Sequence, residues 1–588
     1  MKKLTILLLS VAVLFIAGAC SRRIPVDEVT ELQINNLNVD TMVVGQEIDL
    51  NDVEVKVLLT SGEVDETVNL IEVDYTLKDP DGAEVVVPDL KFTTWLPGSF
   101  SLSVAYGGLS LSIKFSVQMP EQGILVAGET ALRTNIQEAI DAAPDGGTVY
   151  LGAGTFSNEN GNAHLSTASY VDLAIQKPIS LIGAGSEDTT VTFSSAVSKN
   201  DGLSISASDV LIQGVTFDGD LMTTAQNIRL GINPGSHPDD TIFENIRLED
   251  VVSMNAAVSG LQFFRNGDKN FSFKNIEIID SRIENSGSVG LYINEAFIDG
   301  LKIINSAVTH SGQNPDEEYG PGIHLWGPVK DLEIRDSDIS YNKFDGIMIE
   351  HALTGMNLIE NNQILANNQD NCATEWNKGW ATSSGIRVNA RFGDINNLTI
   401  RGNTIDFEDQ FGRGIILMGG LAWHEDDYDD YKLDGVHIEE NTIITNYQTG
   451  DSNGYSIWIY YGNEKPLMSD IVIHENHFHN NYSKDQGFFI GFYREGVGGA
   501  NFATEAFVVT NNIFESLNHQ VMRIQRDLYV QGDVSHEDAT AWFNTIASLS
   551  GNVSRYNDVD YDIVMANAGD TSTSMFNLRR DPVDLYLP

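Results

Sequence analysis

The alternation of hydrophobic and polar residues divides the chain into two parts. Between residues 25 and 118, short segments such as "VEVKVLL", "VNLIEVDYTL" and "LSLSIKFSV" alternate apolar and polar positions. Turn residues separate them at intervals of about ten residues, which is typical of an antiparallel β-sandwich. The segment carries no cluster of titratable residues. A spacer is therefore the preferred interpretation, with a weak sugar-binding module as the alternative.

A different pattern begins after residues 119–128. Leu132, Ile136, Ala139 and Ile140 would share one face of a helix, and Pro144 with the turn "DGG" would end it. A short strand is predicted next, over residues 149–151.

An internal repeat of the form I-x-x-N/S-x-I then continues to the C-terminal region. Its polar position is Ser281, Ser306, Ser337, Asn362, Asn403, Asn441, Asn476 and Asn512. Such a repeat predicts stacked coils of parallel strands, with the variable spacing taken up by loops at fixed corners. The Asn and Ser side chains should lie above one another and hydrogen-bond along the stack.

Each predicted coil carries a second strand, and these strands can be aligned with one another. Their apolar first and third positions should face the core, which leaves three outward columns. The first column is Gln262, Tyr292, His324, Met348, Arg387, Ile416, Trp458, Gly491 and Arg523. The second is Phe264, Asn294, Trp326, Glu350, Asn389, Met418, Tyr460, Tyr493 and Gln525. The third is Arg265, Glu295, Gly327, His351, Ala390, Gly419, Tyr461, Arg494 and Arg526.

The helix followed by "GGTVYLGAGTF" resembles the opening of the pectin-lyase-like superfamily. The resemblance implies an all-β chain with a right-handed parallel β-helix over residues 125–560, whose N-terminal end is covered by a short amphipathic helix. Such a cap shields the apolar core and the unpaired strand edges. Residues 561–588 would be a C-terminal tail or cap. The segment 25–118 is similar to immunoglobulin-like modules that lie near bacterial lipid anchors.

The first residues form a targeting segment rather than part of the fold. Lys2 and Lys3 precede an apolar run, and Ala17-Gly18-Ala19 supplies small residues before Cys20. Residues 1–19 with Cys20 resemble a bacterial lipoprotein signal, although Ala17 stands where that family usually has leucine. The resemblance implies lipidation of Cys20, and Ser21 favours the outer membrane, facing the periplasm or the cell surface. An ordinary secretory signal is the alternative.

The composition narrows the range of partners. Asp and Glu number 83 against 35 Lys and Arg, for a formal net charge of -48. This balance opposes nucleic-acid binding, which depends on neutralising phosphates. No later segment is long and apolar enough to span a bilayer. The only other cysteine is Cys372, so a lipidated chain would have no internal disulfide. A monomer is expected.

The three columns predict an exposed, aromatic and locally basic face. Trp326, Trp458, Tyr460 and Tyr493 can stack sugar rings. Arginines in the columns outnumber the acids, and they are Arg265, Arg387, Arg494, Arg523 and Arg526. An anionic polysaccharide is the ligand that such a face predicts. The alternative is that these side chains only cover the strands and keep them soluble.

Two long insertions flank this face. Residues 366–385 bring Trp376, Lys378 and Trp380, and residues 421–435 bring Trp423. Long loops in compact folds are usually functional or disordered, and these aromatic residues favour the walls of a cleft. A Ca²⁺ ion could bind the carboxylates of the second insertion, but a solvated acidic turn is an equal alternative. These carboxylates are Glu425, Asp426, Asp427, Asp429 and Asp430.

Members of the superfamily are polysaccharide lyases, glycoside hydrolases or non-catalytic adhesins. A lyase is favoured because Arg387 could neutralise a uronate carboxylate while His351, His324 or Tyr460 removes a proton. Glu350 would orient His351 or Arg387, or bind Ca²⁺. The alternatives are a hydrolase using Glu350 and Glu295, two coils apart, and an adhesin. The characteristic polygalacturonase and pectate-lyase motifs are absent. Pectin, alginate and ulvan would all fit as the substrate.

Glu350, His351 and Arg387 are predicted to share one cleft beside Trp326 and Tyr460. Replacing His351 or Arg387 by alanine should then lower turnover and leave the melting temperature nearly unchanged.

Overall fold

The computed structural model describes most of the sheet regions of the 588-residue chain. The described residues are 29–35, 37, 42–44, 47–51, 53–59, 64–94, 96–106, 108–119, 121–129, 131–157, 171–193, 201–220, 226–231, 240–265, 271–316, 319–369, 383–408, 410, 412–419, 431–445, 455–461, 468–480, 488–494, 506–516, 520–525, 544, 547–567 and 575–580. The predicted signal segment, with Cys20, lies outside them. None of the described helices is long and apolar enough to cross a membrane. The chain divides into two compact units, residues 1–133 and 134–588.

The first unit is an antiparallel β-sandwich, as predicted. One sheet pairs β1 (Val29–Asn35), β3 (Glu54–Leu59) and β4 (Val64–Asn69). The other contains β5 (Asp74–Lys78), β6 (Glu84–Val85), β8 (Gly98–Tyr106) and β9 (Leu109–Val117). A small pair joins β2 (Glu47–Asp49) to β7 (Lys91–Thr93). Leu50, Val55, Leu70 and Leu102 are fully buried in a common core.

The second unit begins with the helix α1 (Ile136–Ala142). Asn135 caps it by accepting a hydrogen bond from the Glu138 amide at 2.7 Å. Ile136, Ala139 and Ile140 are buried as predicted, but Leu132 is 44% exposed and precedes the helix. The predicted helical face was therefore one turn too long, because the cap at Asn135 sets the start.

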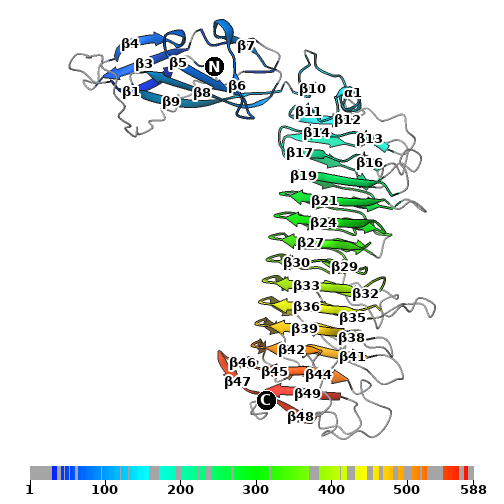
Figure 1. Cartoon of the computed structure of the whole chain (residues 1–588). Helices are drawn as coiled ribbons and strands as arrows, with labels where there is room; N and C mark the ends of the chain where they lie inside the picture. The colour runs from blue at the N-terminus through cyan, green and yellow to red at the C-terminus, as the bar shows by residue number, and fades with distance from the viewer. Residues whose placement is uncertain are drawn as a thin grey trace. The chain divides into compact units, whose positions relative to one another are not determined.

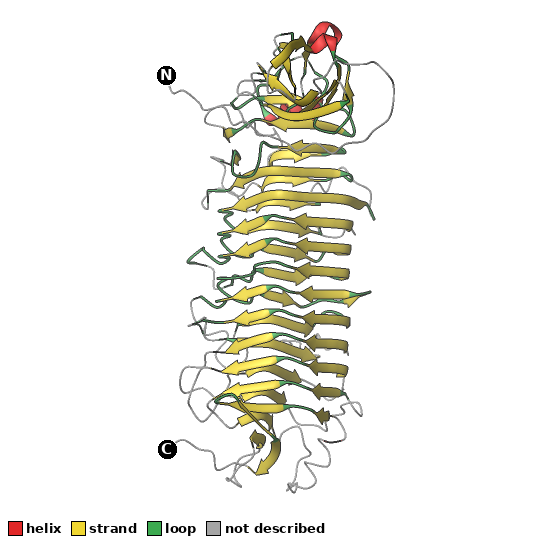
Figure 2. Cartoon of the chain, turned by 90° about the vertical axis from the view of Figure 1, so that its left-hand side faces the viewer, coloured by secondary structure: helices red, strands yellow, loops and turns green. Residues whose placement is uncertain are grey.

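The rest of the second unit is a parallel β-helix whose coils stack along the chain (Figure 1, Figure 2). Sheet 1 contains β13 (Val171–Ile175), β16 (Asp201–Ile205), β18 (Gln226–Leu230), β20 (Ser259–Phe264), β23 (Leu291–Asn294), β26 (Ile323–Trp326), β28 (Ile347–Ile349), β32 (Ser384–Ala390), β35 (Arg413–Gly419), β38 (Tyr455–Tyr461), β41 (Phe488–Arg494) and β44 (Gln520–Gln525). At its C-terminal end β49 (Met575–Arg580) and β48 (Ile563–Asn567) add antiparallel strands. These strands come from the region predicted to be a tail or cap.

Sheet 2 is the longest sheet, and most of its strands follow a sheet 1 strand in the chain. Its strands include β11 (Gly147–Leu151), β12 (Gly154–Ser157), β14 (Ile179–Ile182), β15 (Thr189–Thr192), β17 (Val210–Asp218), β19 (Ile242–Met254), β21 (Ser272–Ile279), β22 (Arg282–Glu284), β24 (Phe297–Ile304), β25 (Ala307–Thr309), β27 (Val329–Arg335), β29 (Leu353–Thr354), β30 (Asn357–Glu360), β33 (Ile395–Arg401), β36 (Leu433–Glu439), β39 (Met468–His474), β42 (Phe507–Thr510) and β45 (Ala547–Ser550).

Sheet 3 is built from the short strands that follow the repeat's polar residue. It contains β31 (Gln363–Leu365), β34 (Thr404–Asp406), β37 (Thr442–Thr445), β40 (His477–Asn480), β43 (Ile513–Ser516), β46 (Val553–Tyr556) and β47 (Val559–Tyr561).

The repeat's polar residues form the predicted ladder between sheets 2 and 3. Asn403 donates from Nδ2 to Asn441 Oδ1 at 2.9 Å, and Asn441 donates in the same way to Asn476 at 3.0 Å. Asn552, which the repeat search missed, accepts from Asn512 at 2.9 Å and extends the row. The residue before each ladder position has a positive φ, as at Asn361 (56°) and Gly402 (64°), and this left-handed residue turns the ladder side chain inward.

Candidate functional site

The strands of sheet 1 pair in the register predicted from the sequence. Tyr292 is aligned with His324, His324 with Met348, and Met348 with Arg387. The row continues through Ile416 and Trp458 to Gly491 and Arg523. The core-facing residues alternate with this row, and Ile347 and Ile349 are fully buried. The first column of side chains is therefore confirmed.

The prediction that this face is openly exposed is wrong for its central residues. Glu350 is only 2% exposed, His324 and Arg387 are 3% exposed, and Trp458 is 4% exposed. Charged groups are buried at low cost only when they are paired and hydrogen-bonded. The charged side chains meet this condition, because Glu350 pairs with His324 and Arg387 pairs with Asp345.

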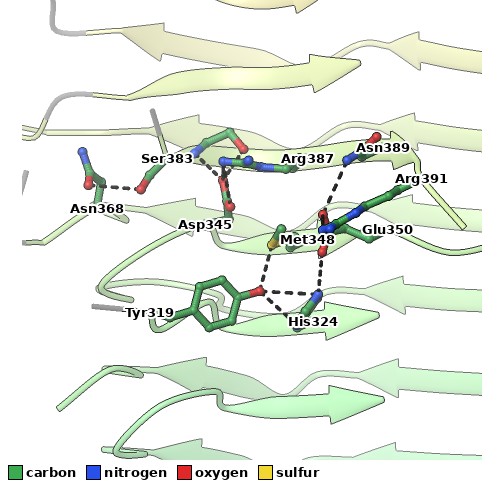
Figure 3. A network of polar contacts seen from close by, with 11 residues as sticks. Tyr319, His324, Asp345, Met348, Glu350, Asn368, Ser383, Arg387, Asn389 and Arg391 are labelled. Carbon is green, nitrogen blue, oxygen red and sulfur yellow. Dashed lines mark hydrogen bonds and ion pairs between the residues drawn. The ribbon is translucent and has the colours of Figure 1, made fainter. Parts of the chain in front are cut away.

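Tyr319, His324 and Glu350 form a continuous polar chain across two coils (Figure 3). The Tyr319 hydroxyl lies 3.0 Å from His324 Nδ1 and 3.1 Å from the Met348 sulfur. His324 Nε2 lies 3.2 Å from Glu350 Oε2. Tyr319 precedes β26 and was not predicted as a site residue, because it stands in a turn outside the repeat.

The other oxygen of Glu350 faces two further side chains that were not among the predicted site residues. Asn389 Nδ2 and Arg391 NH1 each donate to Oε1 at 3.4 Å. The Arg391 guanidinium also lies over the Trp326 ring, 5.1 Å from its centroid, and over the Phe392 ring at 4.7 Å. Arg391 is 17% exposed and is therefore more accessible than Glu350.

Arg387 is held by a buried carboxylate rather than by Glu350. Its NH2 group lies 3.1 Å from Asp345 Oδ2, and Asp345 also accepts a hydrogen bond from the Ser384 amide at 2.6 Å. Asp345 lies two residues before the strand β28, and Ser384 begins β32. Figure 3 shows this pair beside the Tyr319–His324–Glu350 chain.

The charges in the cluster are set by burial and by these partners. Burial raises the pKa of Glu350, but the His324 hydrogen bond and the charges of His324, Arg391 and Arg387 outweigh it and hold that pKa below its usual value. The pKa of Asp345 is raised, because burial outweighs the effect of Arg387. Burial and the nearby carboxylates also raise the pKa of Tyr319 well above its usual value. The cluster thus combines an ionised Glu350 with a neutral phenol.

His351 points away from this cluster. It lies, with Arg265, Glu295, Trp326 and Phe392, in the wall of a cavity of about 600 Å³. Its Nδ1 accepts a hydrogen bond from the Ala352 amide at 2.8 Å, so the neutral ring carries its proton on Nε2. Burial lowers the pKa of His351, which favours that neutral form. Glu350 and His351 are adjacent in sequence, but His351 lines this cavity and Glu350 does not.

Of the remaining predicted site residues, some have described side chains, some have only a described backbone, and some lie outside the described residues. The Arg413 guanidinium lies over the Trp458 ring, with Arg413 Cζ 3.5 Å from the ring centroid. Tyr460, Tyr493, Arg494 and Arg523 lie on later strands of sheet 1, and only their backbone is described. Trp376, Lys378, Trp380, Trp423 and the carboxylates Glu425, Asp426, Asp427, Asp429 and Asp430 lie outside the described residues. No metal-ligand cluster is found at this site among the residues that the structure describes.

Comparison with known proteins bears on the fold. Residues 179–422 match the family described as "Right handed beta helix region". No protein of curated function matches the sequence significantly. The coil architecture and the family match agree on a right-handed parallel β-helix, so the fold that the resemblance implied is confirmed.

Several solved structures are similar, all at low identity. The A-module of mannuronan C-5 epimerase AlgE6 from Azotobacter vinelandii has a TM-score of 0.35 and 16% identity, covering 66% of this chain and 94% of that chain. The catalytic unit of a GH87 α-1,3-glucanase from Streptomyces thermodiastaticus has a TM-score of 0.29 and 10% identity, covering 91% and 86%. The PL6 family alginate lyase AlyGC has a TM-score of 0.24 and 10% identity, covering 72% and 80%.

Proposed function

We propose that this protein degrades a uronate-containing polysaccharide by β-elimination, at the cluster around Tyr319 and His324. The observation that carries the proposal is the Tyr319–His324–Glu350 chain, which places two proton-transfer groups in contact at 3.0 Å. Two guanidinium groups, those of Arg387 and Arg391, flank the same chain.

The reaction class follows from the charges of these groups. The proton on C5 of a uronate becomes removable only when the adjacent carboxylate is neutralised, and Arg391 is the partly exposed cation that would do this. Tyr319 would take the C5 proton after passing its own proton to His324 Nδ1. The ionised Glu350 would stabilise the imidazolium that forms, as in a nucleophile–histidine–carboxylate arrangement. The electron pair of the C5–H bond forms the C4=C5 double bond and the C4–O bond breaks. Tyr319 would then give the proton taken from C5 to the leaving oxygen, and His324 would return its proton to Tyr319.

This assignment alters three roles expected from the sequence. Tyr319 replaces Tyr460 as the tyrosine at the proton-transfer site, and Arg391 takes the substrate-facing role first expected of Arg387. His351 would bind substrate in the neighbouring cavity by donating from Nε2, because Nδ1 is already bonded to the backbone. Trp326, which lines that cavity and lies 5.5 Å from the His324 ring, would join the two regions.

Glycoside hydrolysis by Glu350 and Glu295 is less well supported. A hydrolase of this type needs one carboxyl group that stays protonated, with a raised pKa. The pKa of Glu350 is lowered instead, and Glu295 lies on the wall of the separate cavity. Non-catalytic glycan binding is the other alternative, and the experiment below distinguishes all three.

The test is incubation of the full chain with pectin, alginate, ulvan and a neutral glucan. A lyase would produce absorbance at ~235 nm together with new reducing ends, because each elimination cleaves the chain and leaves an unsaturated uronate. Reducing ends without absorbance would mean hydrolysis. If neither appears with any polymer but a polymer binds, the site is a glycan-binding surface and the proposed reaction is wrong.

We also propose that Cys20 anchors the protein to the outer membrane. The basis is the lysine-led apolar segment that ends in Ala17-Gly18-Ala19-Cys20. Fractionation of cells expressing Cys20→Ala should move the protein from the membrane to the soluble fraction. Unchanged partitioning would contradict a lipid anchor.

A further inference from the structure

A cluster of possible metal ligands lies on sheet 3, apart from the residues discussed above. His477 and His479 stand two positions apart on β40, so their side chains leave the same face of the strand. Phe478 between them is fully buried in the coil interior. Glu515 lies on β43, directly opposite His479 in the parallel register. The repeat thus brings three ligand-type side chains from two neighbouring coils to one place.

The distances between these side chains suit a single ion. His477 Nε2 lies 2.7 Å from Glu515 Oε2, and His479 Nδ1 lies 3.7 Å from the same oxygen. One ligand atom from each residue lies within 4.8 Å of the others. A tetrahedral ion with bonds of ~2.0–2.2 Å holds its ligand atoms roughly 3.3–3.5 Å apart. The three side chains would therefore need to shift by less than ~1 Å to reach that geometry.

We propose that His477, His479 and Glu515 bind a divalent transition-metal ion, with Zn²⁺ as the representative of its class. Two imidazoles and one carboxylate are ligands that Zn²⁺ and its neighbours in the periodic table accept, whereas Ca²⁺ and Mg²⁺ prefer oxygen alone. The side chains are 38%, 32% and 30% exposed, so an ion can reach them and water can complete its coordination.

The surrounding charges are compatible with a bound cation. Arg555 lies opposite Glu515 on β46, but its guanidinium is paired with Asp560 at 2.8 Å. The bound ion would join the coils of β40 and β43, which lie several coils from Tyr319 and His324. Its expected role is to stabilise the C-terminal coils rather than to take part in the reaction.

The test uses the full chain, freed of metal with a chelator and titrated with Zn²⁺ by calorimetry. The wild-type protein should bind one equivalent more than His479→Gln or His477→Gln, and binding should raise its melting temperature by ~5 °C. His310→Gln is the matched control, because His310 is an exposed histidine that stacks on Tyr341 at 5.3 Å, away from the cluster. It should bind Zn²⁺ as the wild type does.

Titration with Co²⁺ gives a second measurement that does not depend on activity. Coordination by two imidazoles and a carboxylate should produce visible absorption bands in the wild type and in His310→Gln, and not in His479→Gln. Circular dichroism establishes that each variant is folded, and Glu515→Gln replaces any histidine variant that is not. If the wild type and the folded cluster variants take up the same amount of Zn²⁺, the three residues form only a surface ion pair and the proposal is wrong.

Discussion

Glu350 and Arg387 show at the residue scale how charge is kept inside this face. Each is almost fully buried, and each has a partner of opposite charge or a protonatable partner within hydrogen-bonding distance. Removing one member of a buried pair leaves an uncompensated charge, at a cost of about 3–5 kcal/mol. Arg387→Ala should therefore destabilise the fold, contrary to the expectation drawn from an exposed arginine. Loss of activity in that variant would not separate catalysis from folding.

A substitution at Tyr319 separates an effect on catalysis from an effect on folding. Tyr319→Phe removes the hydroxyl that contacts His324 and Met348 but keeps the ring, which packs 5.5 Å from Phe344. On the polysaccharide that the incubation test identifies as the substrate, turnover should fall by ~10²-fold or more, because the proton-transfer group is lost. The melting temperature should change little, since one hydrogen bond contributes only about 1 kcal/mol.

Tyr341→Phe is the matched control for that substitution. Its hydroxyl lies 3.3 Å from Glu408 at an exposed position on another face of the coil, and its loss should affect neither turnover nor stability. Equal turnover in Tyr319→Phe and Tyr341→Phe would remove Tyr319 from the mechanism.

Asp172 predicts a pH dependence of stability. Its carboxylate on β13 is 1% exposed and has no hydrogen-bond partner among the described residues. Burial, aided by the charge of Asp201, raises its pKa from 3.8 to about 7. The folded state therefore holds this proton more tightly than the unfolded chain does. Stability should fall as pH rises from about 4 to about 7, by a few kcal/mol at most, and then level off.

Asp172→Asn should remove the contribution of Asp172 to that dependence, because an amide is neutral throughout the range. Its melting temperature should exceed that of the wild type by more at pH 8 than at pH 5, as measured by thermal unfolding in matched buffers. Asp316→Asn, at an exposed carboxylate, should show no such divergence. A constant difference between Asp172→Asn and wild type across this range would mean that Asp172 is ionised in both states.

At the scale of elements, the asparagine ladder links each coil to the next through buried side-chain hydrogen bonds. Asn441 donates to the Ile400 carbonyl at 2.8 Å and to Asn476, and it accepts from the amide and side chain of Asn403 at 2.9 Å. Asn441→Ala would leave several buried groups unpaired and should cost about 3 kcal/mol or more. Thr442→Ala, on the adjacent half-buried residue, should cost clearly less in the same denaturant titration. Equal losses would show that the ladder adds nothing beyond ordinary packing.

The same ladder explains which parts of the structure could be predicted from the sequence. Asn362, Asn403 and Asn441 recur because each coil needs an inward-facing hydrogen-bonding side chain there, so the repeat and the register of sheet 1 follow from periodicity alone. Tyr319 lies in a loop outside the repeat and reaches the site only through the folding of that loop. Asp345 precedes the repeated Gly-Ile of sheet 1, level with Ser384 on the next coil, but nothing in the repeat marks its pairing with Arg387. The separation of His351 from Glu350 is also a property of a corner, because the strand β28 ends at Ile349.

On the scale of the whole molecule, the net charge of -48 works against folding. Repulsion among like charges weakens as salt screens it, with a Debye length of ~30 Å at 0.01 M and ~3 Å at 1 M. The melting temperature should therefore rise when NaCl is increased from ~10 mM to ~0.5 M, where most of the long-range repulsion is screened. A fall would show that the surface ion pairs, such as that between Arg401 and Glu360, outweigh the general repulsion.

The stacking of coils also has a mechanical consequence. Among the described strands of the β-helix coils, each parallel strand pairs only with strands of the adjacent coils. A force applied to the C-terminal end would therefore break the backbone hydrogen bonds of one coil at a time. Neighbouring ladder residues are 25 residues apart at Ser337 and Asn362 and 41 apart at Asn362 and Asn403. Each released coil would lengthen the chain by roughly 90 to 140 Å. Pulled in this way, the molecule would unwind in steps whose lengths reproduce the spacing of the repeat.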